Sequence, residues 1–524
     1  MNSPADAEIS AVESAALAQE RLSARALPRP ATPLLQIVFW ALIGAAAFHA
    51  AYAFPNAGFL TVVYVFALLQ LARSDPWRRA AHAGLAVGLL IAVWRLGFFW
   101  RIFGPGAIAL WWIYAFWIGL FVALARLCLR EFDGNRGWFL VPFVWVGLEY
   151  FRSELYYLRF SWLNPGYAFS GALGQVPLRD AGMYGVGFLL AAIATAAAFV
   201  WSKSRMRSMG LMLAGAGAIW VWGAMQATPQ GDGRVVHVAG VQMEFPTEGE
   251  VRLRLNDLVR KFPETELIVL SEYTFGEPVP PKVKQWCREH ARYLVVGGKD
   301  PAPGGDFYDT AFVIGPTGEI VFRQVKSVPI QFFKDGRPAP EQKLWASPWG
   351  KIGICICYDL SYTRVTDRLI AQGAGALIVP TMDVVDWGES QHEMHARVAP
   401  VRAAEYGVPI FRVASSGISQ AVDREGRVMA TAPCPGDGAM IAGTITVGGG
   451  GRRPLDRWLG PVGTGVTLLV AAWLVIRRLG TKTEIRTQDS EILNKSELQS
   501  PSTKPTRERV PAVQNLAEER EAKC

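Results

Sequence analysis

Long apolar blocks separated by short polar stretches dominate the first 226 residues and predict helices that cross a membrane. Several blocks approach the roughly 20 residues that a helix needs to span a bilayer. The blocks lie at about 33–53, 58–72, 83–100, 107–129, 137–152, 181–201, 209–226 and 459–476. We therefore expect a polytopic α-helical membrane bundle of about eight transmembrane helices.

The charges between the blocks predict how these helices are oriented. Arg and Lys gather after the second, fourth, sixth and eighth blocks, which are alternate loops. Cytoplasmic loops carry the excess of positive charge in membrane proteins, so these loops and both termini are expected inside the cell. Residues 230–450 then lie outside, although Arg452, Arg453 and Arg457 stand on the wrong side for this rule. We assign the net charge of +8 to this topology signal and expect no nucleic-acid partner.

The region after the seventh block has the alternation of a soluble α/β domain. Helical patterns cover Arg252–Lys261 and about 391–405. The turn Gly315-Pro-Thr-Gly318 indicates a hairpin between two of the expected strands. The expected strands are Val235–Gln242, Leu267–Leu270, Tyr293–Gly297, Thr310–Ile314, Glu319–Gln324, Ala376–Pro380, Ile410–Ser415 and Gln420–Asp423. Such alternation predicts a sheet covered by helices.

These patterns divide the chain into five segments. They are a cytoplasmic N-terminal tail at 1–32, a transmembrane bundle of about seven helices at 33–228, an α/β domain at 233–448, a last transmembrane helix at 459–478 and a disordered cytoplasmic tail at 479–524. The N-terminal tail lacks the features of a cleaved secretory signal. Residues 153–180 are aromatic and poor in charge, so we expect a periplasmic arm lying on the outer leaflet. The C-terminal tail is rich in Lys, Glu, Ser, Thr and Gln, which is typical of disorder.

The stretch Gly353–Asp359 carries candidate chemistry because an apolar run ends there in a cysteine, Cys357. Glu272 and Lys326 follow two other expected strands. A carboxylate can take a thiol proton, an ammonium can stabilise a developing oxyanion, and a thiolate can attack a carbonyl. A buried cysteine is more often inert packing, and this role suits Cys355 between its two isoleucines.

We expect the two cysteines of this stretch to lie on one strand, with a nearby Lys326 ammonium lowering the pKa of the Cys357 thiol. The six cysteines of the chain show neither zinc nor disulfide spacing. His392-Glu-Met-His395 also lacks the spacing of a His-Glu-x-x-His zinc motif, so no metal site is expected.

The order of these residues resembles that of the nitrilase, or carbon–nitrogen hydrolase, superfamily. Val269-Leu-Ser-Glu272, Lys326-Ser-Val-Pro329 and Ile354-Cys-Ile-Cys-Tyr-Asp359 look like its glutamate, lysine and cysteine motifs. The resemblance implies an α-β-β-α sandwich with a catalytic Glu-Lys-Cys triad formed by Glu272, Lys326 and Cys357.

The membrane portion narrows the resemblance to the bacterial apolipoprotein N-acyltransferase family, over nearly all of residues 35–478. Segments similar to that family are Glu149-Tyr-Phe-Arg152, Phe160-Ser-Trp-Leu163, Tyr184-Gly-Val-Gly-Phe-Leu189 and Arg402-Ala-Ala-Glu405. The resemblance implies supporting or substrate-binding roles for Trp162, Tyr358, Asp359, Asp383 and His395.

The resemblance also implies a function. The enzyme would sit in the bacterial inner membrane, with its catalytic domain on the periplasmic face. It would move an acyl chain from a membrane phospholipid onto Cys357, and then onto the N-terminal diacylglyceryl-cysteine amine of an apolipoprotein. Such ping-pong transfer needs no cofactor, and both substrates are held in the same bilayer.

Three positions depart from the family pattern. Phe332 stands near the place of a further glutamate, Asp359 replaces a glutamate, and Met382 precedes Asp383 where the family usually has Asn. We expect Gln331, Lys334 or Glu341 to take over from the missing glutamate. These departures keep two alternatives open, a membrane-tethered amidase of the nitrilase family and a catalytically inactive scaffold that binds lipoproteins.

The topology can be tested by labelling from outside the cell. In a background without native cysteines, a membrane-impermeant maleimide is expected to label Asp300→Cys in intact cells and to leave Ser490→Cys unlabelled, because only position 300 is predicted to lie outside. Permeabilised cells are the control, in which both variants should react. Labelling of Ser490→Cys in intact cells contradicts the topology.

Overall fold

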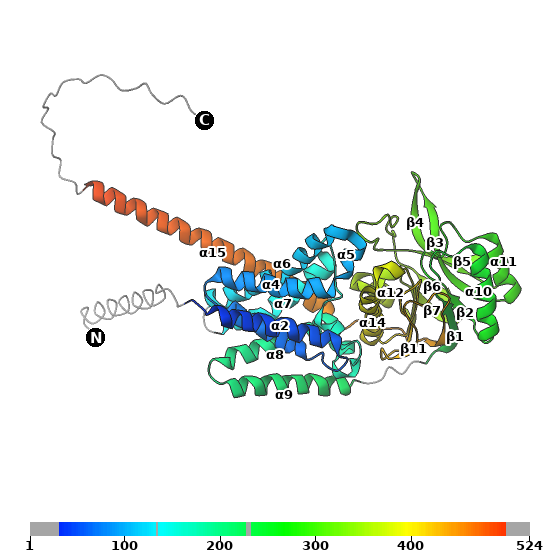
Figure 1. The fold of residues 1–524 in the computed structure, drawn as a ribbon, viewed down its shortest axis with the longest axis horizontal. Helices are drawn as coiled ribbons and strands as arrows, with labels where there is room; N and C mark the ends of the chain where they lie inside the picture. The colour runs from blue at the N-terminus through cyan, green and yellow to red at the C-terminus, as the bar shows by residue number, and fades with distance from the viewer. Residues whose placement is uncertain (1–30, 133–134, 227–231, 499–524) are drawn as a thin grey trace, which may run out of the picture. The chain divides into compact units, whose positions relative to one another are not determined.

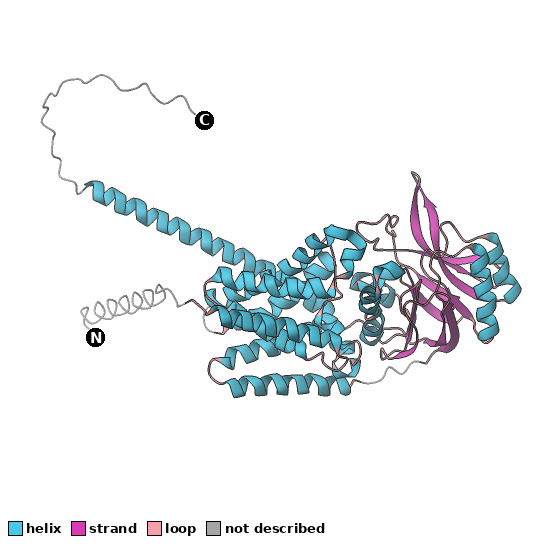
Figure 2. Cartoon of the chain, viewed as in Figure 1, coloured by secondary structure: helices cyan, strands magenta, loops and turns pink. Residues whose placement is uncertain are grey.

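The computed structural model describes residues 31–132, 135–226 and 232–498, with side chains described as far as residue 477. A helical membrane bundle is joined to an α-β-β-α sandwich, which confirms the fold class expected from the sequence (Figures 1 and 2). The expectations for residues 1–30 and 499–524 lie outside the described residues.

Every predicted apolar block contains a helix. The bundle helices are α2 (Leu34–Ala53), α3 (Leu60–Ala72), α4 (Trp77–Arg95), α5 (Phe98–Phe103), α6 (Ala107–Glu131), α7 (Arg136–Tyr150), α8 (Leu178–Trp201), α9 (Arg205–Ala224) and α15 (Asp456–Leu498). Within the described residues, only Leu34–Ala53, Phe98–Glu131, Leu178–Trp201 and Asp456–Arg477 are long and apolar enough to span a membrane. The expected number of eight spans is therefore not confirmed. Helices α3 and α7 have 13 and 15 residues, fewer than the roughly 20 that a span needs.

The arm between α7 and α8 packs into the protein more than the sequence predicts. A π-helical turn at Phe151–Leu155 and short 3-10 turns at Pro165–Phe169 and Leu173–Gln175 carry the chain across. Residues 161–169 are buried, and Asn164 accepts a hydrogen bond from Arg152 and donates one to Ser153. The polar groups of this stretch thus find partners inside the protein, and the expected position of the arm on the outer leaflet stays a prediction.

The sandwich consists of two six-stranded sheets. The first has the order β12-β1-β2-β3-β4-β5 and the second β11-β10-β9-β8-β7-β6. Its strands are β1 (Arg234–Val241), β2 (Leu267–Val269), β3 (Tyr293–Ala302), β4 (Asp306–Ile314), β5 (Ile320–Val325), β6 (Leu344–Ser347), β7 (Gly350–Ile354), β8 (Ala376–Thr381), β9 (Ile410–Ala414), β10 (Ser419–Val422), β11 (Val428–Ala432) and β12 (Met440–Val447). Strands β1, β2 and β3 run parallel to one another, as do β7, β8 and β9.

Helices cover the outer faces of both sheets. On the first sheet, α10 (Glu248–Lys261) and α11 (Pro281–His290) bury Leu255 and Trp286 in one apolar core with the strands (Figure 1). On the second sheet lie α12 (Thr363–Ala371), α13 (Glu389–Ala396) and α14 (Val398–Tyr406). The single helix expected over 391–405 is thus divided at Arg397. The division fits Pro400, which lacks an N–H and is tolerated only in the first turn of a helix.

Buried polar contacts join the sandwich to the bundle. Glu154 of the arm accepts hydrogen bonds from the backbone N–H and the hydroxyl of Thr363, at 3.0 and 2.9 Å, and from the hydroxyl of Tyr184 at 3.0 Å. Glu405 accepts a hydrogen bond from the backbone N–H of Met183 at 3.0 Å. Buried carboxylates are costly unless they are paired, so these contacts fix the sandwich over this end of the bundle.

Arg457 belongs to the same junction, which explains its position on the wrong side for the charge rule. Its guanidinium lies 2.8 Å from Asp367, 3.0 Å from Glu405 and 2.5 Å from Asp456. It is therefore a buried structural cation and not a loop charge that reports topology.

The final helix α15 differs from the prediction for the C-terminal tail. Disorder was expected over 479–524, whereas α15 continues as helix to Leu498. The prediction rested on polar composition, but the Glu, Lys and Leu residues of this stretch are also strong helix formers.

Candidate active site

The candidate nucleophile Cys357 sits on a strained turn immediately after a strand. β7 ends at Ile354, and Cys357 opens the 3-10 turn Cys357–Ser361 with a φ of +51°. The expectation that both cysteines lie on one strand is therefore wrong. A positive φ is uncommon for a residue with a side chain and is often found at functional sites. The turn brings Cys357 to the wall of a cavity, while Cys355 stays wholly buried.

The structure brings Glu272 and Lys326 together near the end of their strands. Glu272 lies three residues beyond β2, and Lys326 directly follows β5. The Lys326 ammonium nitrogen Nζ is 2.6 Å from Glu272 Oε1. Both side chains are at most 1% exposed, so the pair is shielded from water and its charges interact strongly.

Met382 connects this pair to the candidate nucleophile. Its backbone N–H donates to Glu272 Oε2 at 2.7 Å, and its carbonyl accepts a hydrogen bond from the Cys357 thiol at 3.6 Å. In addition to burial, the negative charge of Glu272 acts on that thiol and raises its pKa. The three predicted residues therefore form one contiguous group in which a proton can pass from sulfur to carboxylate.

The surroundings of Cys357 keep its thiol protonated. Burial raises the pKa of Cys357 well above its usual value, and the negative charge of Glu272 raises it further. The ammonium of Lys326 acts in the opposite direction but does not outweigh them, so the expectation of a lowered pKa is wrong. Formation of the thiolate then requires transfer of the proton at the moment of reaction.

Two further carboxylates surround Lys326, and the sequence analysis missed both. Asp335 Oδ2 lies 2.7 Å and Asp309 Oδ2 3.5 Å from the ammonium nitrogen. Burial and the charge of Glu272 raise the pKa of Asp309 well above its usual value. The convergence of three carboxylates could also hold a metal ion, but here the Lys326 ammonium supplies the positive charge.

Asp335 makes further contacts around Lys326, whereas the replacement of the family's glutamate by Gln331, Lys334 or Glu341 stays a prediction. Asp335 accepts hydrogen bonds from the Tyr273 hydroxyl at 2.8 Å and from the backbone N–H of Ile330 at 2.7 Å. Gln331 instead donates to the carbonyl of Tyr157, and Glu341 pairs with Lys343. Asp335 lies three residues after Phe332 in the sequence. Its acidic side chain is the one sequence feature from which a role beside Lys326 could have been predicted.

Asp359 joins the lysine segment to the cysteine turn. Its carboxylate accepts hydrogen bonds from the backbone N–H groups of Ser327, Val328 and Ile356, at 2.8 to 3.3 Å. Burial raises the pKa of Asp359 to about 6, although these bonds oppose the shift. Asp359 thus holds the lysine segment and the cysteine turn in position. It does not line the cavity to which Cys357 belongs.

Asp383 and His395 form a second support. Asp383 binds Arg412 at 2.5 Å and the His395 ring nitrogen Nδ1 at 2.8 Å. The hydrogen-bonded His395 and the guanidinium of Arg412 lower the pKa of Asp383, although burial opposes them. Burial lowers the pKa of His395, so its ring is neutral near pH 7, and it stacks on Trp162 with 4.8 Å between the ring centres.

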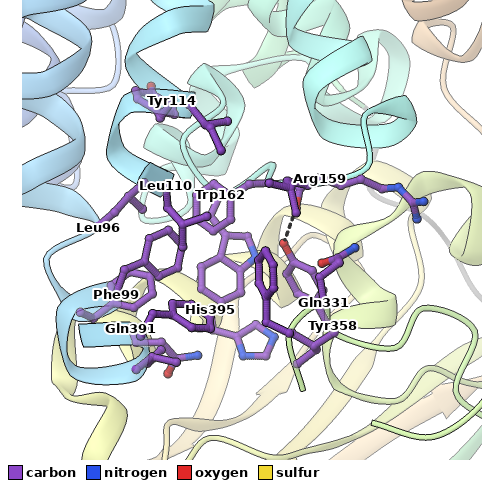
Figure 3. A pocket seen from close by; sticks show the side chains of 18 of the residues that line it. Leu96, Phe99, Leu110, Tyr114, Arg159, Trp162, Gln331, Tyr358, Gln391 and His395 are labelled. Atoms are coloured by element: carbon purple, nitrogen blue, oxygen red, sulfur yellow. Dashed lines mark hydrogen bonds between the residues drawn. The ribbon is translucent and has the colours of Figure 1, made fainter. Parts of the chain in front are cut away.

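The predicted residues Trp162, Tyr358 and His395 line one cavity together with Cys357 (Figure 3). The Tyr358 hydroxyl donates to the carbonyl of Arg159 at 3.0 Å, and the Trp162 indole donates to the Ser361 hydroxyl at 3.0 Å. The rest of the wall is mainly aromatic and aliphatic, and comes from α5, α6, the arm and sandwich residues such as Phe332 and Phe333. We call this space the apolar cavity; its further lining includes Phe98, Phe99, Ile102, Phe103, Leu110 and Trp117.

Comparisons with known proteins agree with this architecture. The family model described as "Apolipoprotein N-acyltransferase N-terminal domain" matches residues 41–196, and the model "Carbon-nitrogen hydrolase" matches residues 259–447. The chain is 25% identical to the apolipoprotein N-acyltransferase of Geobacter metallireducens, over 76% of this chain and 88% of that protein. It is 24% identical to the enzyme of the same name from Shewanella oneidensis, over 71% of this chain and 80% of that protein. The crystal structure of Nit3 from Saccharomyces cerevisiae, a nitrilase superfamily member, matches 41% of this chain and 90% of its own, with 19% identity and a TM-score of 0.35.

The contact between Asp335 and Lys326 predicts that Asp335 positions the ammonium. Asp335→Asn keeps the shape but removes the charge, and breaking a buried pair costs about 3 kcal/mol. We expect a lower melting temperature and a slower reaction of Cys357 with an ester substrate, followed by intact-protein mass spectrometry. The matched control is Asp306→Asn, since Asp306 pairs with Arg337 on the exposed surface. Wild-type acylation by Asp335→Asn would refute this role.

Proposed function

The chain belongs to the apolipoprotein N-acyltransferase family of the carbon–nitrogen hydrolase superfamily, and on that premise we propose how its site works. The protein is a membrane acyltransferase that moves an acyl chain from a phospholipid to the N-terminal diacylglyceryl-cysteine amine of apolipoproteins. The observation that carries this proposal is the position of Cys357. Met382 links its thiol to the buried Glu272–Lys326 pair, and Cys357 also lines an apolar cavity walled largely by the membrane bundle.

The first step forms an acyl-enzyme. Glu272 takes the proton of Cys357 as the sulfur attacks the ester carbonyl of the phospholipid. Lys326 and the backbone N–H of Tyr358 stabilise the oxyanion. The C–O bond then breaks, the lysophospholipid leaves with the proton from Glu272, and a thioester remains on Cys357. The raised pKa of the Cys357 thiol supports proton transfer during the attack, because the thiol is not already ionised when the substrate binds.

The second step transfers the chain to the acceptor. The α-amine of the diacylglyceryl-cysteine attacks the thioester carbonyl, and Glu272 accepts a proton from the nitrogen. The C–S bond breaks, an amide forms, and the Cys357 thiol regains its proton. Burial and the charge of Glu272 raise the pKa of the neighbouring Asp309, which limits the negative charge that is buried beside the Lys326 ammonium.

The acyl donor and the acceptor are both anchored in lipid, and the cavity suits such substrates. Its wall comes largely from α5, α6 and the arm, and only a few polar groups reach it. We propose that the sandwich lies on the periplasmic face of the inner membrane, as the distribution of Arg and Lys indicates.

The amidase and scaffold alternatives are not favoured. An amidase needs water at the thioester, whereas Cys357 opens into a mainly apolar cavity. The N-terminal half also matches the acyltransferase family model, which a tethered amidase would not need. A scaffold has no use for a buried Glu-Lys pair in contact with a strained cysteine, because both features cost stability.

The assignment of the nucleophile can be tested by trapping the first intermediate. Incubation of the full chain with phospholipid should give an acyl adduct that hydroxylamine removes. The adduct should survive Cys355→Ala and disappear in Cys357→Ala, because only Cys357 reaches the cavity. Glu272→Ala should also prevent its formation, since the thiol proton then has no acceptor. An adduct in Cys357→Ala would show that the nucleophile lies elsewhere.

A further inference from the structure

A second cavity lies on the other side of the reacting groups. Glu272 and Lys326 line this second cavity, whereas Cys357 lines the apolar cavity. The two cavities share Ile330, Phe333 and Trp387 as lining residues. The reacting groups therefore stand at a boundary between two spaces of different chemistry.

The second cavity is larger and more polar than the first. Its volume is about 550 Å³, against about 130 Å³ for the apolar cavity. We call it the polar groove; its lining includes Phe245, Glu272, Tyr273, Lys299, Lys326, Lys334, Asp335 and Trp387. Hydroxyl, ammonium and aromatic groups are all available there to a ligand that carries polar atoms along its length.

The groove has an excess of positive charge. Glu272 and Asp335 neutralise Lys326, which they contact directly. Lys299 and Lys334 add two further ammonium groups, and Lys299 lies over the rings of Tyr273 and Phe307 at 5.5 and 4.7 Å. The surface carboxylate of Asp306 also interacts electrostatically with Lys334, but it is paired with Arg337. An anionic ligand is therefore favoured over a cationic one.

The acceptor lipoprotein carries a lipid and a peptide on the same cysteine, and the two cavities suit these two substituents. Its reacting amine and its lipid-bearing thioether belong to one cysteine, and the same cysteine begins a peptide. When the amine reaches the thioester on Cys357, the lipid needs apolar surroundings and the peptide needs polar ones. A boundary between an apolar and a polar space meets both needs at once.

We propose that the polar groove binds the first peptide residues after the lipidated cysteine and prefers acidic side chains there, through Lys299 and Lys334. This inference rests on the proposed acyl transfer and adds a specificity to its second step. The phospholipid headgroup is also anionic, but it is not the proposed occupant, because it leaves with the lysophospholipid before the acceptor binds.

The test separates the two steps of the reaction. The full chain in lipid nanodiscs is first acylated on Cys357 and freed of donor. It is then given diacylglyceryl-peptides that differ only after the cysteine, with Asp-Glu, Asn-Gln or Lys-Lys at the next two positions. We expect kcat/KM for the acidic peptide to exceed that for the basic peptide by about tenfold, the effect of two exposed charge contacts. Added salt should reduce the difference.

The double variant Lys299→Ala/Lys334→Ala should lose this preference. The control is Lys343→Ala, because Lys343 is equally exposed but pairs with Glu341 away from the groove. Equal rates for the three peptides, or a preference that persists in the double variant, would overturn the proposal. So would a double variant that slows acylation by phospholipid, since the lysines would then serve the headgroup. A wild-type protein that forms no acyl-enzyme would instead refute the proposed function itself.

Discussion

The site depends on one buried ammonium that has to be neutralised. Lys326 is withdrawn from water, and such a charge is tolerated only where carboxylates meet it. The carboxylates come from separate parts of the first sheet and its loops: Glu272 beyond β2, Asp309 within β4, and Asp335 after β5. The requirement to pair Lys326 therefore ties three segments together, and it places the proton acceptor Glu272 against Cys357 from the second sheet.

Two cavities with different linings adjoin the ion cluster around Lys326. On one side the arm and α5 provide aromatic walls that suit acyl chains, and on the other side the cavity opens among lysines and hydroxyl groups. Buried contacts such as Glu154 with Thr363 hold the sandwich to the bundle, so the position of Cys357 relative to the apolar wall is fixed. The sandwich by itself has no α5 or α6 to form this wall, which gives a physical reason for joining the two parts in one chain.

Much of the fold, and the three central residues of the site, could be predicted from the sequence. Apolar blocks located the helices, and the apolar runs ending at Glu272, Lys326 and Cys357 indicated residues that the structure brings together. The end of the apolar run indicated a turn near Cys357, but the alternating isoleucines extend the strand pattern beyond Ile354, where tertiary contacts end β7. Asp335 was missed for a related reason: a loop has no periodicity from which the direction of a side chain can be inferred.

The pKa of Cys357 was predicted in the wrong direction because only one neighbour was considered. From the sequence, Lys326 counted as a free positive charge, whereas in the structure its carboxylate partners neutralise it. The thiol therefore experiences burial and the negative charge of Glu272. We propose on this basis that Glu272 has to accept the thiol proton during the reaction.

The pH dependence of Cys357 modification, compared with Glu272→Gln, tests this claim most directly. In a Cys355→Ala background, a small methanethiosulfonate reagent is applied over a range of pH, and the Cys357 peptide is quantified by mass spectrometry. Loss of the Glu272 charge should lower the apparent pKa of the thiol, so the variant should react faster than the wild type near neutral pH while failing to form the acyl-enzyme. An unchanged or higher apparent pKa in Glu272→Gln, or acyl-enzyme formation at the wild-type rate, would contradict the account.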